Sequence, residues 1–239
     1  MLQSTLSHAL RHALHRTLHR TLRHSLLALA LGAGSALALA AAPPTYHVEI
    51  DTSTFQASGF GSAGWLDLQF NPSNMGGAAA TALTTHFFGA FDNTQPAQLT
   101  SGVTGSLVQG FTFTNGDSYN DLFQAFNFGA SIGFDVSFSG APDSGQNLID
   151  SVFAVSVYDA AGTTALGNYA ANGSLLQLSW TPPADAAGDG MVGVSVADNF
   201  NSSVSAVPEP STWLMLLAGV GMVWLRPSRR HGDARLMAL

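Results

Sequence analysis

The sequence predicts an all-β protein in which residues 41–206 form an antiparallel β-sandwich with jelly-roll-like connections. Apolar residues alternate with small or polar ones over many short segments, and turn-forming residues separate these segments. Short strands with one apolar face each are stable when two sheets pack face to face. A signal peptide is expected before this domain, in residues 1–40, and a short transmembrane helix after it, within residues 207–239.

About eight segments have the period-two pattern of a strand. The clearest is 132–138, where isoleucine, valine and two phenylalanines alternate with glycine, aspartate and serine. The other expected strands are 46–50, 66–70, 83–91, 107–114, 153–157, 176–180 and 192–196. Asn115-Gly116-Asp117 and Asn172-Gly173 supply turn chemistry between them. One stretch, 118–126, has its apolar residues at helical spacing and is the one candidate helix of this region.

Charge is distributed unevenly along the chain. All basic residues are arginines, and they lie only in residues 11–23 and 226–235. Of the 15 acidic residues only Glu209 and Asp233 lie outside residues 41–206, which therefore hold 13 acids and no Lys or Arg. Nucleic-acid binding and arginine clamps on anionic ligands are excluded for this region. The absence of cysteine excludes disulfides, thiol nucleophiles and thiolate metal sites.

The first 40 residues have the pattern of a secretory signal peptide. Arginines from Arg11 to Arg23 supply the positive region, and an uncharged stretch rich in Leu and Ala follows. Ala38 and Ala40 form the small-residue cleavage pattern, so the mature chain is expected to begin near Ala41. Export through the Sec machinery follows from this interpretation, and a transit peptide is the weaker alternative.

A proline-rich motif, an apolar segment and an arginine cluster follow the β-rich region. The motif is Val207, Pro208, Glu209 and Pro210, and the expected membrane anchor runs from Trp213 and Leu214 to Leu225, followed by Arg226, Arg229 and Arg230. The uncharged residues 211–225 span about 22 Å as a helix, less than the ~30 Å of a hydrocarbon core. Snorkelling arginines and local thinning of the bilayer make up the difference. The arginines are expected to stay cytoplasmic, with everything before Pro208 outside.

At these residues the chain resembles the PEP-CTERM class of exported bacterial proteins. In that class a Pro-Glu-Pro motif, a short hydrophobic helix and an arginine cluster form a sorting signal that is read by an exosortase, a membrane-embedded transpeptidase-like enzyme. The resemblance implies an inner-membrane anchored precursor that is then sent to the cell surface or the medium. The extra tail His231 to Leu239 departs from the usual pattern. An ordinary tail anchor is the alternative.

Three central stretches also resemble a recurring family of PEP-CTERM proteins of unassigned function. They are Gly105 to Thr114, Asn120 to Phe126, and Gly133 to Phe138. Their motifs are structural, so this resemblance implies a fold and not an activity.

No convincing catalytic constellation is present, and the protein is not expected to be an enzyme. His47 and His86 are the histidines of the β-rich region, and Gly129-Ala130-Ser131-Ile132-Gly133 fits the nucleophile-elbow pattern. The elbow requires a helix after the serine, whereas a strand is expected after Ser131. A secreted hydrolase is therefore the weakest of the functional alternatives.

Calcium is the one cofactor that the sequence suggests, because hard oxygen ligands on loops suit Ca²⁺. The candidate ligands are Asp143, Asp150, Asp185 and Asp189, although the EF-hand spacing is absent. Trp65 and Trp180 would stack on sugars if they were exposed, but tryptophans in alternating strands are more simply core residues.

Three functions therefore remain open. The acidic, lysine-free composition favours a structural or interaction role in the envelope or the exopolysaccharide matrix. A carbohydrate-binding module is the first alternative, and a hydrolase is the second.

Overall fold

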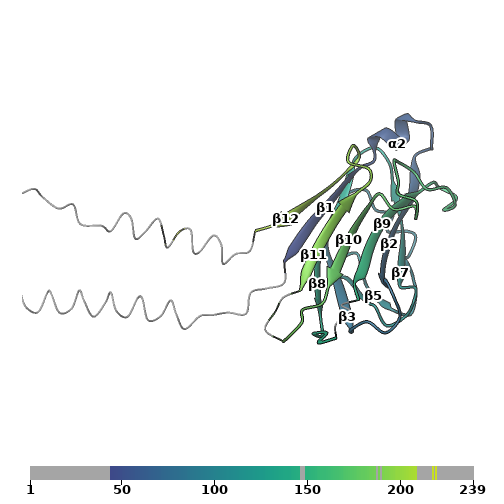
Figure 1. Ribbon diagram of the computed structural model, residues 1–239. Coiled ribbons are helices and arrows are strands. Elements are labelled where there is room, and N and C mark those ends of the chain that lie inside the picture. The colour runs from purple at the N-terminus through teal and green to yellow at the C-terminus, as the bar shows by residue number, and fades with distance from the viewer. Residues whose placement is uncertain are drawn as a thin grey trace, which may run out of the picture. The chain divides into compact units, whose positions relative to one another are not determined.

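Two antiparallel sheets of six strands each pack face to face in the computed structural model (Figure 1). The structure describes residues 44–145, 149–186, 188, 190–208, 217 and 219. The chain divides into two compact units, Met1–Ala42 and Pro43–Leu239, and the sandwich belongs to the second. The expectation of an all-β sandwich is confirmed.

The twelve strands of the described residues alternate between the sheets along much of the chain. Sheet A has the order β12 (Ser202–Val207), β1 (Thr45–Asp51), β8 (Ser131–Gly140), β3 (Ala80–Phe88), β6 (Gly110–Thr114) and β5 (Val103–Ser106). Sheet B has the order β11 (Met191–Val196), β10 (Leu176–Thr181), β9 (Ser151–Tyr158), β2 (Ala63–Pro72), β7 (Asp121–Asn127) and β4 (Gln98–Leu99). Strands β1 to β4 change sheet at every step, and so do β6 to β9, as connections that cross between the layers of a jelly roll do.

Phenylalanines fill much of the space between the sheets. Phe134 of β8 is fully buried and lies against Phe87 and Phe153, with ring centroids 5.4 and 6.1 Å away. Phe113 and Phe138 also contact Phe153, so the ring of β9 joins both layers. Edge-to-face packing of this kind stabilises a core beyond the area it buries. The chain has no cysteine, so this apolar interface has no disulfide to assist it.

The candidate helix at residues 118–126 is wrong. Residues Asp121–Asn127 form β7, which pairs with β2 on one side and β4 on the other. Leu122 and Phe126 are buried in the core, whereas Phe123 lies on the outer face. Nine residues are too few for a stable isolated helix, so pairing with two strands decides the conformation. The sequence pattern also missed β4, β5, β12 and the short helix α2 (Ser53–Ala57).

The two predicted terminal segments cannot be compared with the structure. Ala38, Ala40, Glu209, Pro210, Trp213, Leu214, Leu225, Arg226, Arg229 and Arg230 lie outside the described residues. In the part of the chain that is described, no helix is long and apolar enough to cross a membrane.

The paired first and last strands predict an autonomous domain. We expect residues 44–208, expressed alone, to be soluble and to give a β-type far-UV circular dichroism spectrum, because both sheets are then complete. A shorter fragment that stops at residue 201 lacks β12 and leaves β1 as an unprotected edge, so it should be less stable and should aggregate. A helix-dominated spectrum of the longer fragment, or equal stability of the two, would contradict this prediction.

Candidate functional site

The sorting motif begins at the end of β12. Val207 is the last residue of this strand and pairs with Thr45, the first residue of β1. Pro208 follows at once, and a proline has no N–H with which to continue the pairing. The strand therefore ends where the Pro-Glu-Pro segment starts.

A second candidate site is a cavity of about 470 Å³ on the outer face of sheet B, here named the acidic cavity. Its walls come from β2, β4, β7 and β9 and from the loops beside them. The lining residues used below are Asp67, Gln69, Gln98, Thr100, Tyr119, Asp121, Phe123 and Tyr158.

Strand register brings the polar residues of this cavity together. Asp67 lies opposite Phe123, and Gln69 lies opposite Asp121, on the adjacent strands β2 and β7. Leu66 and Leu68, the neighbours of Asp67, point into the core, so Asp67 points outward. Asp67 is nevertheless only 3% exposed.

Asp67 and Asp121 form a close pair of carboxyl groups. The Oδ2 atom of Asp67 accepts a hydrogen bond from Gln69 Nε2 at 2.9 Å, and that of Asp121 accepts one from Tyr119 Oη at 3.2 Å. The Oδ1 atoms of both aspartates are buried and accept no hydrogen bond from any other residue. Burial, followed by the hydrogen bond and the charge of Asp121, raises the pKa of Asp67 to about 9. Asp67 is therefore protonated at neutral pH.

Aromatic side chains border the acidic cavity. Trp65 stacks on Phe123 with ring centroids 4.9 Å apart, and Phe123 contacts Tyr158 at 5.7 Å. Tyr119 is 52% exposed, and burial of its hydroxyl together with the nearby Asp121 raises its pKa to about 12. Trp180, by contrast, is 2% exposed in the core, so it cannot stack on a sugar.

Asp143, Asp150 and Asp185, the sequence-predicted calcium ligands that the structure describes, do not form a three-carboxylate cluster. Asp143 Oδ1 accepts a hydrogen bond from Gly145 N, and Asp150 Oδ1 accepts one from Thr181 Oγ1. The exposed Asp185 accepts the N–H of Gly188 through its backbone oxygen, and Asp189 lies outside the described residues. Within residues 44–145, 149–186 and 190–208, no three His, Asp or Glu side chains are arranged to hold a metal ion. Calcium binding at these loops stays a prediction.

Both histidines of the domain meet at one carboxylate on the outer face of sheet A. His47 Nδ1 lies 2.7 Å from Asp135 Oδ1, and His86 Nδ1 lies 2.8 Å from Asp135 Oδ2. His86 has a φ of +52°, within a bulge of β3 between Thr85 and Phe88. The bulge turns His86 outward and lets Phe87 enter the core, where it packs on Phe111 and Phe134.

The sequence missed this cluster because a bulge changes which face a residue occupies. The described hydrogen bonds of His47 and His86 go to Asp135 and, more weakly, to Thr85, and none reaches Ser131. Ser131 is the first residue of β8, so a strand follows it, as expected.

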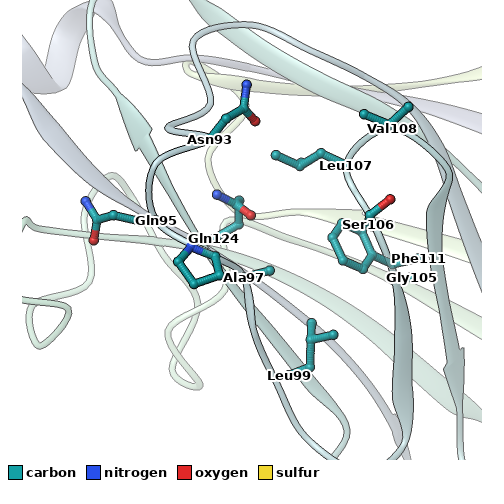
Figure 2. Close-up of a pocket in the computed structure, with 11 residues that line it drawn as sticks. Asn93, Gln95, Ala97, Leu99, Gly105, Ser106, Leu107, Val108, Phe111 and Gln124 are labelled. Atoms are coloured by element: carbon teal, nitrogen blue, oxygen red, sulfur yellow. The ribbon is translucent and has the colours of Figure 1, made fainter.

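A second cavity of about 350 Å³ lies beside the β5–β6 hairpin. Figure 2 shows Leu107 of the hairpin reaching into the space next to the segment that carries Asn93 and Ala97. Gln124, at its floor, is buried and donates to the backbone oxygens of Asp92 and Ala125. Its lining holds no ionisable side chain, so the acidic cavity has the more distinctive chemistry.

The raised pKa of Asp67 predicts a pH-dependent effect of Asp67→Asn. The folded protein keeps a proton that the unfolded chain releases above about pH 4, so this group's contribution to stability is lost as pH rises towards about 9. We expect the free energy of unfolding of the variant to exceed that of the wild type by a margin that grows as the pH rises. The margin should reach at least about 1.4 kcal/mol, the equivalent of one pKa unit, at the alkaline end.

Urea unfolding at several pH values, in buffer with a chelator, measures this margin. Asp117→Asn is the matched control, because the exposed Asp117 is little desolvated on folding. A margin that stays flat between pH 4 and 9 would contradict the prediction.

Comparison with known proteins identifies the C-terminal segment. The family model described as the PEP-CTERM protein-sorting motif matches residues 206–230. No curated protein and no solved structure is significantly similar to the chain. The chain therefore carries a PEP-CTERM protein-sorting motif, and this motif implies an exported, surface-directed protein that is processed by an exosortase.

Proposed function

We propose that the precursor is exported by the Sec machinery, anchored in the inner membrane by its C-terminal helix, and cut by the exosortase at or near Pro208–Pro210. The released or transferred β-sandwich then has a structural or interaction role in the envelope or the exopolysaccharide matrix. The observation that carries this proposal is that the sorting motif starts where β12 ends.

Cleavage at this point leaves the fold intact. All residues of β12 that pair with β1, from Ser202 to Val207, precede Pro208. Proline disfavours helical backbone in the residue before it, so a Pro-Glu-Pro sequence suits a peptidase that binds extended chain. Processing thus separates a complete domain from its anchor.

The chemistry of the domain supports a non-catalytic role. With 13 acids and no Lys or Arg between residues 41 and 206, it is suited to a hydrated, anionic surface. Asp135 holds both imidazoles, and the one serine in an elbow-like motif, Ser131, has no described hydrogen bond to them. We therefore propose a matrix protein rather than a hydrolase.

Intact-mass analysis of surface protein tests the processing. In a host with the exosortase, the mature chain should begin near Ala41 and lack Trp213 and everything after it. Deletion of the exosortase gene should restore the C-terminal segment to the observed mass. A species that keeps Trp213 to Leu239 in both hosts would leave a plain tail anchor as the explanation.

A carbohydrate-binding role is the second candidate, and the acidic cavity is the observation that favours it. Gln69, Gln98, Thr100 and Tyr119 offer neutral donors and acceptors, and Tyr158 adds an aromatic wall. An open cavity with convergent polar groups and aromatic borders suits a polyhydroxylated ligand.

Affinity electrophoresis in gels that contain the host's exopolysaccharide tests this role. We expect retention of the wild type and about three- to tenfold weaker retention of Tyr119→Ala, since one aromatic hydroxyl contact is lost. Tyr169→Ala is the control, because Tyr169 is 50% exposed, close to the 52% of Tyr119, and lies outside this cavity. Equal mobility with and without polysaccharide argues against the role.

A further inference from the structure

The acidic cavity contains two carboxyl oxygens that receive no hydrogen bond from any residue outside their own pair. Asp67 Oδ1 and Asp121 Oδ1 are both buried and have no partner among the other residues, while the Oδ2 atoms accept hydrogen bonds from Gln69 and Tyr119. Most buried polar atoms in proteins have a partner, so each exception needs an explanation. The two orphaned oxygens belong to neighbouring carboxyl groups that line the same cavity.

No side chain of the domain can supply a positive charge to this pair. Residues 41–206 contain no Lys or Arg, and the two histidines are bound to Asp135 on the other sheet. The charge that neutralises the carboxyl groups must therefore come from solvent, as a proton or as a dissolved cation.

The other oxygen atoms of the cavity match a hard cation. Tyr119 Oη lies 3.2 Å from Asp121 Oδ2, and the side chains of Gln98 and Thr100 lie in the same lining. Ca²⁺ binds six to eight oxygens in irregular geometry and accepts water and amide oxygens beside carboxylates. Neither histidine nor cysteine lines the cavity, which disfavours Zn²⁺ and copper.

We propose that the acidic cavity binds one Ca²⁺ ion, with Asp67 Oδ1 and Asp121 Oδ1 as its carboxylate ligands and neutral side-chain oxygens and water completing its coordination. Binding of the ion displaces the proton of Asp67 to solvent, and the ion then bridges the two carboxylates and ties β2 to β7 across the sheet. Two carboxylates give a modest affinity, in the range of extracellular modules, with a Kd of about 0.1–1 mM. This range fits a protein that is displayed outside the cell.

Thermal unfolding of the full chain, purified from membranes in detergent, tests the proposal. About 10 mM CaCl₂ should raise the Tm of the wild type by roughly 3 °C or more, and NaCl of equal ionic strength should not. Asp67→Asn and Asp121→Asn should each lose this shift. Asp143→Asn and Asp150→Asn, which alter the loop carboxylates suggested by the sequence, should keep it.

Two outcomes of the unfolding experiment overturn the proposal. The wild type shows no calcium-dependent shift, or the shift persists in Asp67→Asn and disappears in Asp143→Asn or Asp150→Asn. A measurement on the unaltered protein keeps the proposal testable if the variants do not fold. Tb³⁺ should luminesce when Tyr119 is excited and should be displaced by Ca²⁺. Absence of this signal also overturns the site.

Discussion

Packing between the inner faces of the two sheets is the interaction on which the remaining structure depends. Phe153 of β9 meets Phe113, Phe134 and Phe138 of the opposite sheet, so one ring links strands from both layers. Burial of a phenylalanine contributes about 1.5–3 kcal/mol, and no disulfide is available to replace it. Because this core holds the strands in place, the outer faces can carry residues whose burial or backbone conformation is energetically unfavourable.

Asp67 and His86 are the clearest examples of such residues. Burial of Asp67 beside Asp121 disfavours its ionised form, and the left-handed backbone of His86 departs from regular strand geometry. Each feature brings polar groups together on an outer face, the first on sheet B and the second on sheet A. Groups held at a cost of this kind concentrate at binding sites, which is the physical reason for proposing the acidic cavity as one.

The position of the sorting motif links the fold to its export. Because β12 closes sheet A against β1, the domain is complete at Val207, one residue before the Pro-Glu-Pro segment. The fold of the domain therefore requires no residue of the sorting motif after Pro208. Cleavage after Pro208 removes no strand of the described domain.

Sequence periodicity by itself determined the fold class, most strands and the sorting motif, because alternation and the Pro-Glu-Pro pattern are local properties of the chain. It missed β7, whose spacing fits a helix until β2 and β4 pair with it. It could not single out Asp67, since the burial of Asp67 depends on residues of four strands and is invisible locally. Only the tertiary structure decided that Asp67 meets Asp121 and that His47 and His86 share Asp135, because cross-strand register and one bulge, rather than neighbours in sequence, set those distances.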